Sequence, residues 1–266
     1  MAEESSPSEK MHLVAIYSLN EDKEAMAASL AAVLKVTNYE ALTRLRCPGN
    51  GPLTVAVFAG KEQAEQLSER LNSAGFKSVV LTAEEIAGAT GARIVRSFDL
   101  GENELHIETV NYNKLDIFFR DVDLILCGIT ISRDTATETV KQRSISLGRA
   151  VLSGGIITTK TTKTKQDVTT EARERFINLY AGGIPVSVFR ENTLDYSSLG
   201  PARKSSRSEN FAYVSAELRR HCPGAPYDER LLNRAAQACL LGPLLNPEKH
   251  LAVATALLAK VLRKTV

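Results

Sequence analysis

The chain has 266 residues, a mass of 29.0 kDa and a formal net charge of +2 at pH 7. This length suits two small domains or one large one, and a charge this close to neutral gives no bulk electrostatic argument for nucleic-acid binding. The hydrophobic share of 44 % and the charged share of 24 % are those of an ordinary globular protein.

Both ends of the chain lack the marks of a targeting or membrane segment. Residues 1–10 are polar and acidic, without the basic start and apolar core of a signal peptide, so we expect a disordered tail there. The longest uncharged apolar run near the other end, Leu251–Ala259, is far shorter than the ~20 residues that cross a bilayer. The four cysteines are scattered and contain no C-x-x-C pair, which indicates reduced thiols. We therefore expect a cytoplasmic protein with no membrane span and no cofactor.

The first part of the chain, residues 11–84, alternates strand-like and helix-like segments. Strands are expected at 12–19, 53–59 and 77–82, because these runs are rich in β-branched residues. Two amphipathic helices fit between the first two strands, and one, at 61–74, fits between the second and third. The predicted order is β-α-α-β-α-β, and residues 85–91 are expected to form a linker.

Two segments of this part resemble the C-terminal domain of the ribosomal stalk protein, whose small fold the Clp protease adaptor shares. The stretch around Glu40-Ala41 is similar to the domain's Gly-Leu-x-x-Glu-Ala motif, and the helix that ends in Ala74-Gly75 is similar to its final helix. The resemblance covers roughly residues 11–84 and implies a module that docks a protein partner. The stalk domain docks translation factors through basic positions on its first helices. Ala28, Ala31 and Leu42 stand at those positions here, so we do not expect that activity.

The middle of the chain, residues 92–222, is predicted to be rich in β-strands and to close with an amphipathic helix that begins near Arg207. A polar insertion is expected at about 132–170. The segment Leu115–Ile125 is similar to a strand phrase of bacterial pleckstrin-homology-like domains, which implies a barrel or sandwich here. That class often binds phosphoinositides through basic residues in its first hairpin. The hairpin at 101–104 is acidic in this chain, so we do not expect that activity.

The last part, residues 223–266, is predicted to be helical, with helices from about 227 to 240 and from 247 to 263. The fold class is therefore α+β: a small βααβαβ domain, a β-rich pleckstrin-homology-like domain and a helical tail. An apolar stripe on the last helix fits packing on the chain's own core and binding of a partner equally well. The candidate partner-binding residues are Leu251, Leu258, Val261 and Leu262.

Two basic clusters are candidate anion-binding sites. The first lies in Thr158–Lys165, where lysines alternate with threonine hydroxyls; ammonium and hydroxyl groups together can bind phosphate oxygens. The second lies just before the helix that begins near Arg207, and a helix N-terminus also favours anions. The alternative is an ordinary solvated surface. The candidate residues are Lys160, Lys163, Lys165, Arg203, Lys204 and Arg207.

No catalytic or metal-binding motif stands out. His106-x-Glu108 places two ligand types on one face of a strand, but zinc requires at least three protein ligands, so no metal is expected. Cys222 follows several cations, yet it lies at a helix C-terminus, where the helix dipole opposes a thiolate. We therefore expect a non-enzymatic adaptor that binds a protein partner. The alternatives are a protein that binds nucleic acid or another anion through the Thr/Lys segment, and an enzyme of unrecognised class.

Overall fold

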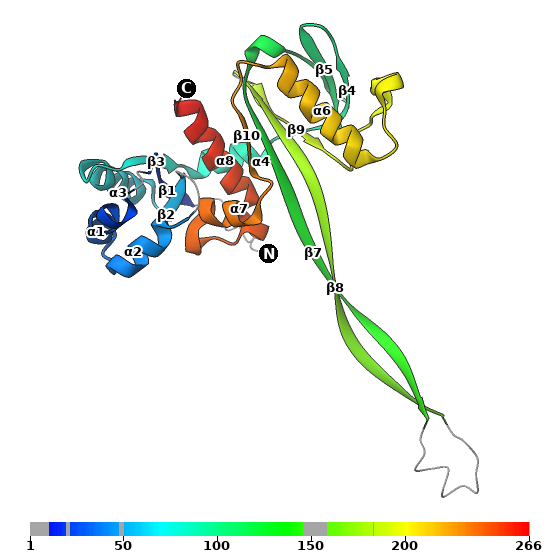
Figure 1. Ribbon diagram of the computed structural model, residues 1–266, viewed down its shortest axis with the longest axis horizontal. Coiled ribbons are helices and arrows are strands. Elements are labelled where there is room, and N and C mark those ends of the chain that lie inside the picture. The colour runs from blue at the N-terminus through cyan, green and yellow to red at the C-terminus, as the bar shows by residue number, and fades with distance from the viewer. Residues whose placement is uncertain (1–10, 20–21, 48–50, 146–158, 183, 266) are drawn as a thin grey trace, which may run out of the picture. The chain divides into compact units, whose positions relative to one another are not determined.

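The computed structural model describes residues 11–19, 22–47, 51–145, 159–182 and 184–265, and the predicted tail at 1–10 lies outside them. The chain forms two compact units. The first unit contains residues 1–130 and 174–266, and the second contains residues 131–173. The α+β class is confirmed, with a small three-stranded sheet, a seven-stranded mixed sheet and C-terminal helices (Figure 1).

The N-terminal part of the first unit has the predicted βααβαβ order. Its antiparallel sheet has the strand order β2-β1-β3, formed by β1 (His12–Tyr17), β2 (Leu53–Phe58) and β3 (Lys77–Leu81). The helices are α1 (Lys23–Leu34), α2 (Asn38–Leu45) and α3 (Lys61–Ser73). Side chains alternate along β1, so Val14 and Ile16 pack against these three helices. Leu13 and Ala15 pack into a second core on the opposite face of the small sheet.

The next segment is a helix, α4 (Ala83–Thr90), which occupies most of the expected linker at 85–91. Thr82 caps it, accepting a hydrogen bond from the Glu85 backbone N–H while the Glu85 carboxylate accepts one from the Thr82 N–H. This reciprocal cap satisfies two of the unpaired backbone donors at the helix N-terminus. The buried side chain of Ile86 then holds the helix against the second core.

The large sheet is open and mixed, so the expected barrel is not formed. Its strand order is β10-β7-β8-β9-β4-β5-β6, and the pairs β4–β9 and β10–β7 are parallel. The strands are β4 (Arg93–Leu100), β5 (Glu104–Thr109), β6 (Lys114–Phe118), β7 (Val122–Ile145), β8 (Thr159–Ala181), β9 (Ile184–Arg190) and β10 (Tyr227–Leu231).

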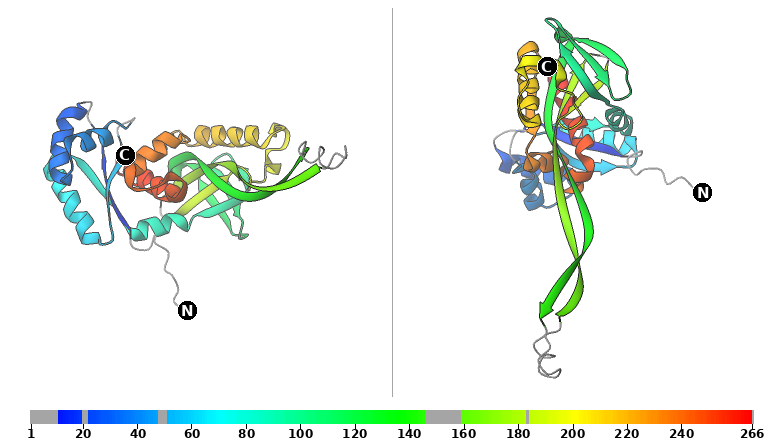
Figure 2. Two further views of the ribbon diagram at one scale, coloured as in Figure 1. Left: turned by 90° about the horizontal axis from the view of Figure 1, so that it is seen from below. Right: turned by 90° about the vertical axis from the view of Figure 1, so that its right-hand side faces the viewer.

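Helices cover both faces of this sheet within the first unit. Ile177 and Leu179 of β8 point to the face covered by α6 (Arg207–His221), while Phe176 and Tyr180 point to the face covered by α8 (Pro247–Thr265). The core around α8 also includes Leu13 of the small sheet, so α8 lies between the two sheets. Figure 2 shows α1–α3 on the opposite side of the small sheet from α7 and α8.

The C-terminal part begins with a strand rather than the helix expected from about residue 227. Tyr227 pairs with Ile125 at the sheet edge, and α7 (Arg234–Leu241) follows. The Thr54 hydroxyl donates a 2.7 Å hydrogen bond to the Leu240 carbonyl, which joins β2 to the end of α7. Gly242 has φ +64°, and a Cβ there would lie 2.6 Å from the Thr54 carbonyl oxygen, so glycine is required for this close approach.

The second unit consists of the distal parts of β7 and β8, residues 131–145 and 159–173, which lie side by side as a two-stranded ribbon (Figure 1). It includes the strand segments of the insertion expected at about 132–170. A strand rises about 3.3 Å per residue, so residues 131–145 alone extend over about 50 Å. Three short 3-10 turns complete the described structure: Phe119–Asp121, Ser197–Ala202 and Gly242–Leu244. Among the described residues, no helix has the length and apolar character that crossing a bilayer requires.

Candidate functional site

The Thr/Lys segment lies on a strand of the ribbon. Lys160, Lys163 and Lys165 belong to β8 within the second unit, and their side chains lie outside the described part of the structure. The backbone alone shows that this segment is paired with β7 rather than folded back as a loop. The lysines therefore stand on an extended two-stranded support.

The ribbon sequence contains further cations that belong to no recognisable motif. Between Glu138 and Asp167 the sequence contains no acidic residue. On the two strands this acid-free stretch has five basic residues, which are Lys141, Arg143, Lys160, Lys163 and Lys165. The signal that could have revealed Lys141 and Arg143 is the local absence of acids. The near-neutral charge of the whole chain hides it.

The ribbon has little apolar sequence with which to stabilise itself. Its strand segments at 131–145 and 159–173 contain mostly Thr, Ser, Lys, Arg and acidic residues, with few apolar ones such as Val140 and Val168. An isolated two-stranded hairpin is marginally stable in water, because it has no third strand or hydrophobic face to bury.

The part of β8 that belongs to the first unit, residues 174–181, is held in place by Arg175; this part is the root of the ribbon. Its guanidinium makes a bidentate ion pair with the Glu191 carboxylate, with N–O distances of 3.0 and 3.2 Å. It also donates to the Ser208 carbonyl and hydroxyl at 2.7 Å, and it lies over the Phe211 ring. The pairing holds the pKa of Glu191 below its usual value. Arg175 thus ties β8 to the first turn of α6.

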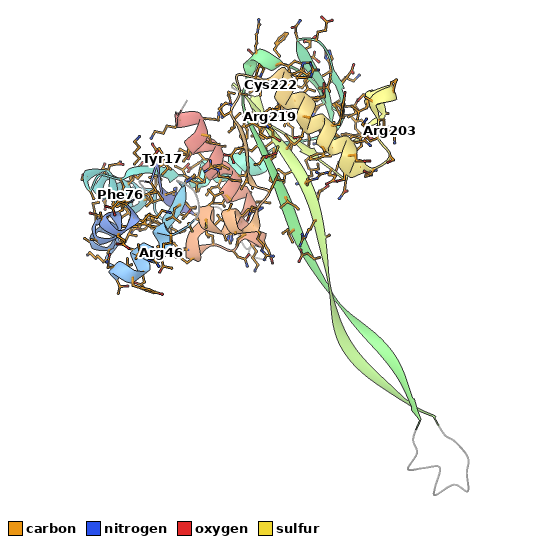
Figure 3. The ribbon with its side chains drawn as sticks, viewed as in Figure 1. Tyr17, Arg46, Phe76, Arg203, Arg219 and Cys222 are labelled. Atoms are coloured by element: carbon orange, nitrogen blue, oxygen red, sulfur yellow. The ribbon has the colours of Figure 1, made fainter. Side chains whose placement is uncertain are left out.

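The second basic cluster surrounds the N-terminus of α6 and is engaged with its own chain. Arg203 lies near this end of α6, and Cys222 lies at the other end (Figure 3). Arg207 donates a 2.9 Å hydrogen bond to the Asn192 carbonyl, and the Lys204 backbone N–H donates to the Asn210 side chain. Within the described part of the chain, Arg207 is therefore the one member of the cluster whose cationic group is shown to hold α6, while Lys204 contributes through its backbone.

The anion position at this helix N-terminus is already filled. Glu209 accepts hydrogen bonds from the Ser206 backbone and hydroxyl, and these bonds lower the pKa of the Glu209 carboxyl. A carboxylate of the chain itself therefore occupies the place where an external anion would bind. Lys160, Lys163 and Lys165 belong to the second unit and the α6 cluster to the first, so the six anion-binding candidates do not form one described site.

The four partner-binding candidates on α8 belong to the chain's own core. Leu258 and Val261 are buried, with exposed fractions of 0 % and 5 %, and Leu251 and Leu262 pack partly buried against the same cluster. Of the two roles predicted for this apolar stripe, the structure supports self-packing. The apolar stripe of the helix is buried because both sheets pack against it.

His106 and Glu108 have separate partners on the surface of the large sheet. The His106 Nδ1 lies 2.7 Å from Asp116 Oδ1, and this hydrogen bond raises the pKa of the exposed imidazole. Glu108 pairs instead with Arg96 at 3.7 Å. Within the described part of the chain, no group of three or more His, Cys, Asp or Glu side chains is placed to hold a metal ion.

The thiols at the large sheet are buried and protonated. Cys222 is 3 % exposed, and burial raises its pKa to about 11. Cys127 is 4 % exposed; burial raises its pKa as well, although hydrogen bonds to Tyr227 and Ser215 act in the opposite direction. A thiolate is the reactive form of cysteine, so neither environment favours a nucleophile.

Comparison of the chain with family models, with curated proteins and with solved structures finds no match. Its function must therefore be inferred from the chemistry of its own residues.

Proposed function

We propose that this protein binds nucleic acid through the ribbon formed by β7 and β8. The observation that carries the proposal is the acid-free stretch between Glu138 and Asp167, which places five cations on two paired strands. Lysine and arginine neutralise phosphates, and threonine and serine hydroxyls donate to phosphate oxygens. A two-stranded ribbon also has the width that the major groove of a DNA duplex admits.

The chain's small overall charge of +2 does not argue against binding by the ribbon. Binding to phosphates depends on local rather than total charge, and the remainder of the chain is close to neutral. The ribbon is better suited to contacting the phosphate backbone of DNA than to recognising bases, because most of its polar residues are Thr, Ser and Lys. We therefore expect binding with little sequence preference.

The test is a salt titration of binding to a fluorescently labelled DNA duplex, followed by anisotropy. The variant replaces Lys160, Lys163 and Lys165 with glutamine. Each lost phosphate contact makes the negative slope of log K against log [salt] less steep by about 0.9. The slope of the variant is therefore expected to be closer to zero by up to about 3, and the variant should bind DNA much more weakly at low salt.

The matched control replaces three exposed lysines of the first unit with glutamine: Lys77, Lys114 and Lys249. It has the same total charge as the test variant and should bind like the unmodified chain. Equal losses in both triple variants would mean that total charge, not the ribbon, governs binding, and the proposal would fail. A parallel titration with polyglutamate distinguishes nucleic acid from an acidic protein partner.

A second function, that of an adaptor that docks a protein, is favoured by Tyr39. This side chain is 77 % exposed on α2, in the part of the chain that resembles docking modules. Both faces of the small sheet are covered, so the outer surface of the helices is the surface left for a partner. A protein captured by the unmodified chain from a native lysate but not by Tyr39→Ser would support this role. Equal capture by both would count against it.

A further inference from the structure

Two neighbouring cavities lie along α8, between this helix and the large sheet. One, of about 460 Å³, lies at the C-terminal end of the helix, and the other, of about 340 Å³, lies toward its N-terminal end. Tyr180 and Val186 line both, so the two cavities form one cleft. The cleft residues of α8 extend from Leu251 to Lys264, which corresponds to about 20 Å of helix.

The walls of the cleft are largely apolar because α8 presents small side chains there. Ala252, Ala256 and Ala259 recur at helical spacing and face Val186 and Val188 of β9. Alanine leaves room between helix and sheet that a larger side chain would fill. Sites of this kind, of a few hundred Å³ with apolar walls and a few polar groups, are typical of small-molecule binding.

Two polar side chains of β8 line the cleft: Asn178 lines the 340 Å³ cavity, and Tyr180 lines both cavities. Asn178 is 8 % exposed, and its Oδ1 has no hydrogen-bond partner among the described residues. A buried polar atom without a partner is costly, so a ligand that pairs with it gains affinity. Tyr180 stands two residues further along the same face, and burial raises its pKa to about 12, although a hydrogen bond with the Asn178 side chain and the charge of Arg263 act in the opposite direction.

One end of the cleft is cationic. Lys260 pairs with Glu85 at 2.5 and 2.6 Å, and Arg263 pairs with Asp123 at 2.7 Å while lying over the Tyr180 ring. Lys264 is exposed and has no ionic partner in the described part of the chain. Three cations therefore face two carboxylates, which leaves a position for one anionic group beside Lys264.

We propose that the cleft along α8 binds an amphipathic carboxylate with a polar hydrogen-bonding group between its anionic head and its apolar tail. The carboxylate lies beside Arg263 and Lys264, the polar group pairs with Asn178, and the tail occupies the cavity lined by Ala252 and Val188. An N-acyl amino acid has this chemistry. The ribbon is not part of this site, so the inference is independent of nucleic-acid binding.

The experiment uses the full chain and isothermal titration calorimetry with N-lauroylglycine below its micelle concentration. We expect one site per chain. The methyl ester of the same compound lacks the charge and is expected to bind at least tenfold more weakly. Laurate keeps the charge but lacks the amide, so it is expected to bind several-fold more weakly. Equal binding of the ester, or no binding of N-lauroylglycine, would overturn the proposal.

Three variants separate the site from non-specific binding. Lys264→Gln is expected to weaken binding at least tenfold, and Ala252→Phe, at an exposed position on the cleft wall, is expected to block the tail. Lys249→Gln on the same helix but outside the cleft should bind like the unmodified chain. Arg190→Gln, at the opposite rim, should have little effect. Equal affinities in Lys264→Gln and Lys249→Gln, or a loss confined to Arg190→Gln, would contradict the assigned orientation.

Discussion

Arg175 and Glu191 show how one residue pair gives the root of the ribbon a dependence on pH. Arg175 holds the pKa of Glu191 below its usual value, so the folded carboxyl binds a proton less readily than the unfolded one. The stabilisation is therefore fully present above the unfolded pKa of about 4.3 and is lost as the pH falls through the folded pKa.

We expect Glu191→Gln to lower the free energy of unfolding at neutral pH and to remove part of its decline below about pH 5. Urea unfolding at a series of pH values measures both effects. Glu62→Gln, at an exposed position on α3, is the matched control and should leave the acid decline unchanged. An acid decline of the same size in Glu191→Gln and in the unmodified chain would show that the pair does not contribute.

Gly128 and Phe176 give a second prediction at this scale. A Cβ on Gly128 would lie 2.2 Å from the Phe176 ring, so Gly128→Ala forces the ring to move. We expect a loss of about 2–3 kcal/mol in the free energy of unfolding, as for other overpacked cores. The double variant Gly128→Ala, Phe176→Leu should recover part of it. Gly88→Ala, with open space around its Cβ, should be neutral or stabilising.

At the scale of the elements, two free cysteines from distant parts of the sequence lie near each other. Cys47 follows α2 and Cys239 lies on α7, and both are partly exposed. The two thiols lie near each other, and burial, together with the Cys239 thiol, raises the pKa of Cys47 to about 12. Two neighbouring, partly exposed thiols can form a disulfide when an oxidant is supplied. Access to the oxidant, rather than a lowered pKa, distinguishes this pair from the buried thiols, because the pKa of Cys47 is itself raised.

Treatment of the folded chain with diamide should therefore cross-link Cys47 to Cys239 and leave the buried Cys127 and Cys222 reduced. Peptide mapping after differential alkylation measures this directly. Cys239→Ser should leave Cys47 unpaired under the same treatment. Oxidation that falls first on Cys127 or Cys222 would contradict the burial described above.

The sequence predicts the elements whose signals are local. The helix expected to begin near Arg207 does begin there, where Ser206 and Glu209 form a capping box, and the β-branched runs correctly place the three strands of the small sheet, although not their order within it. Strand β10 was expected as helix because Tyr227–Leu231 has a mixed polar pattern, and it becomes a strand only through parallel pairing with β7. Long-range pairing of this kind leaves no local signal.

The candidate sites were harder to predict than the elements. Lys160, Lys163 and Lys165 were visible in the sequence, but the strand support beneath them depends on β7, which is paired with β8. The cleft along α8 could not be predicted, because Asn178 and Lys264 come to line its two cavities only when the helix packs on the sheet. The alanines of α8 indicate a buried helix face, but they do not indicate whether a cleft lies beside it.

At the scale of the whole molecule, the chain combines a closely packed first unit with a polar ribbon. In the first unit α8 is shared by the cores of two sheets, so we expect the stability of this unit to be independent of residues 139–166. The ribbon sequence is rich in charged residues and poor in apolar ones. We therefore expect that removal of the acid-free stretch abolishes nucleic-acid binding and leaves the stability of the first unit unchanged.

The most direct test of nucleic-acid binding is therefore a variant in which a two-residue Asn-Gly turn replaces residues 139–166. Salt titrations of duplex binding should give a slope of about −4 to −5 for the unmodified chain, as expected for five cations, and no measurable binding for the shortened variant. The unfolding midpoint should be unchanged. A shortened variant that stays folded and binds DNA with the same affinity and slope would contradict the proposed function.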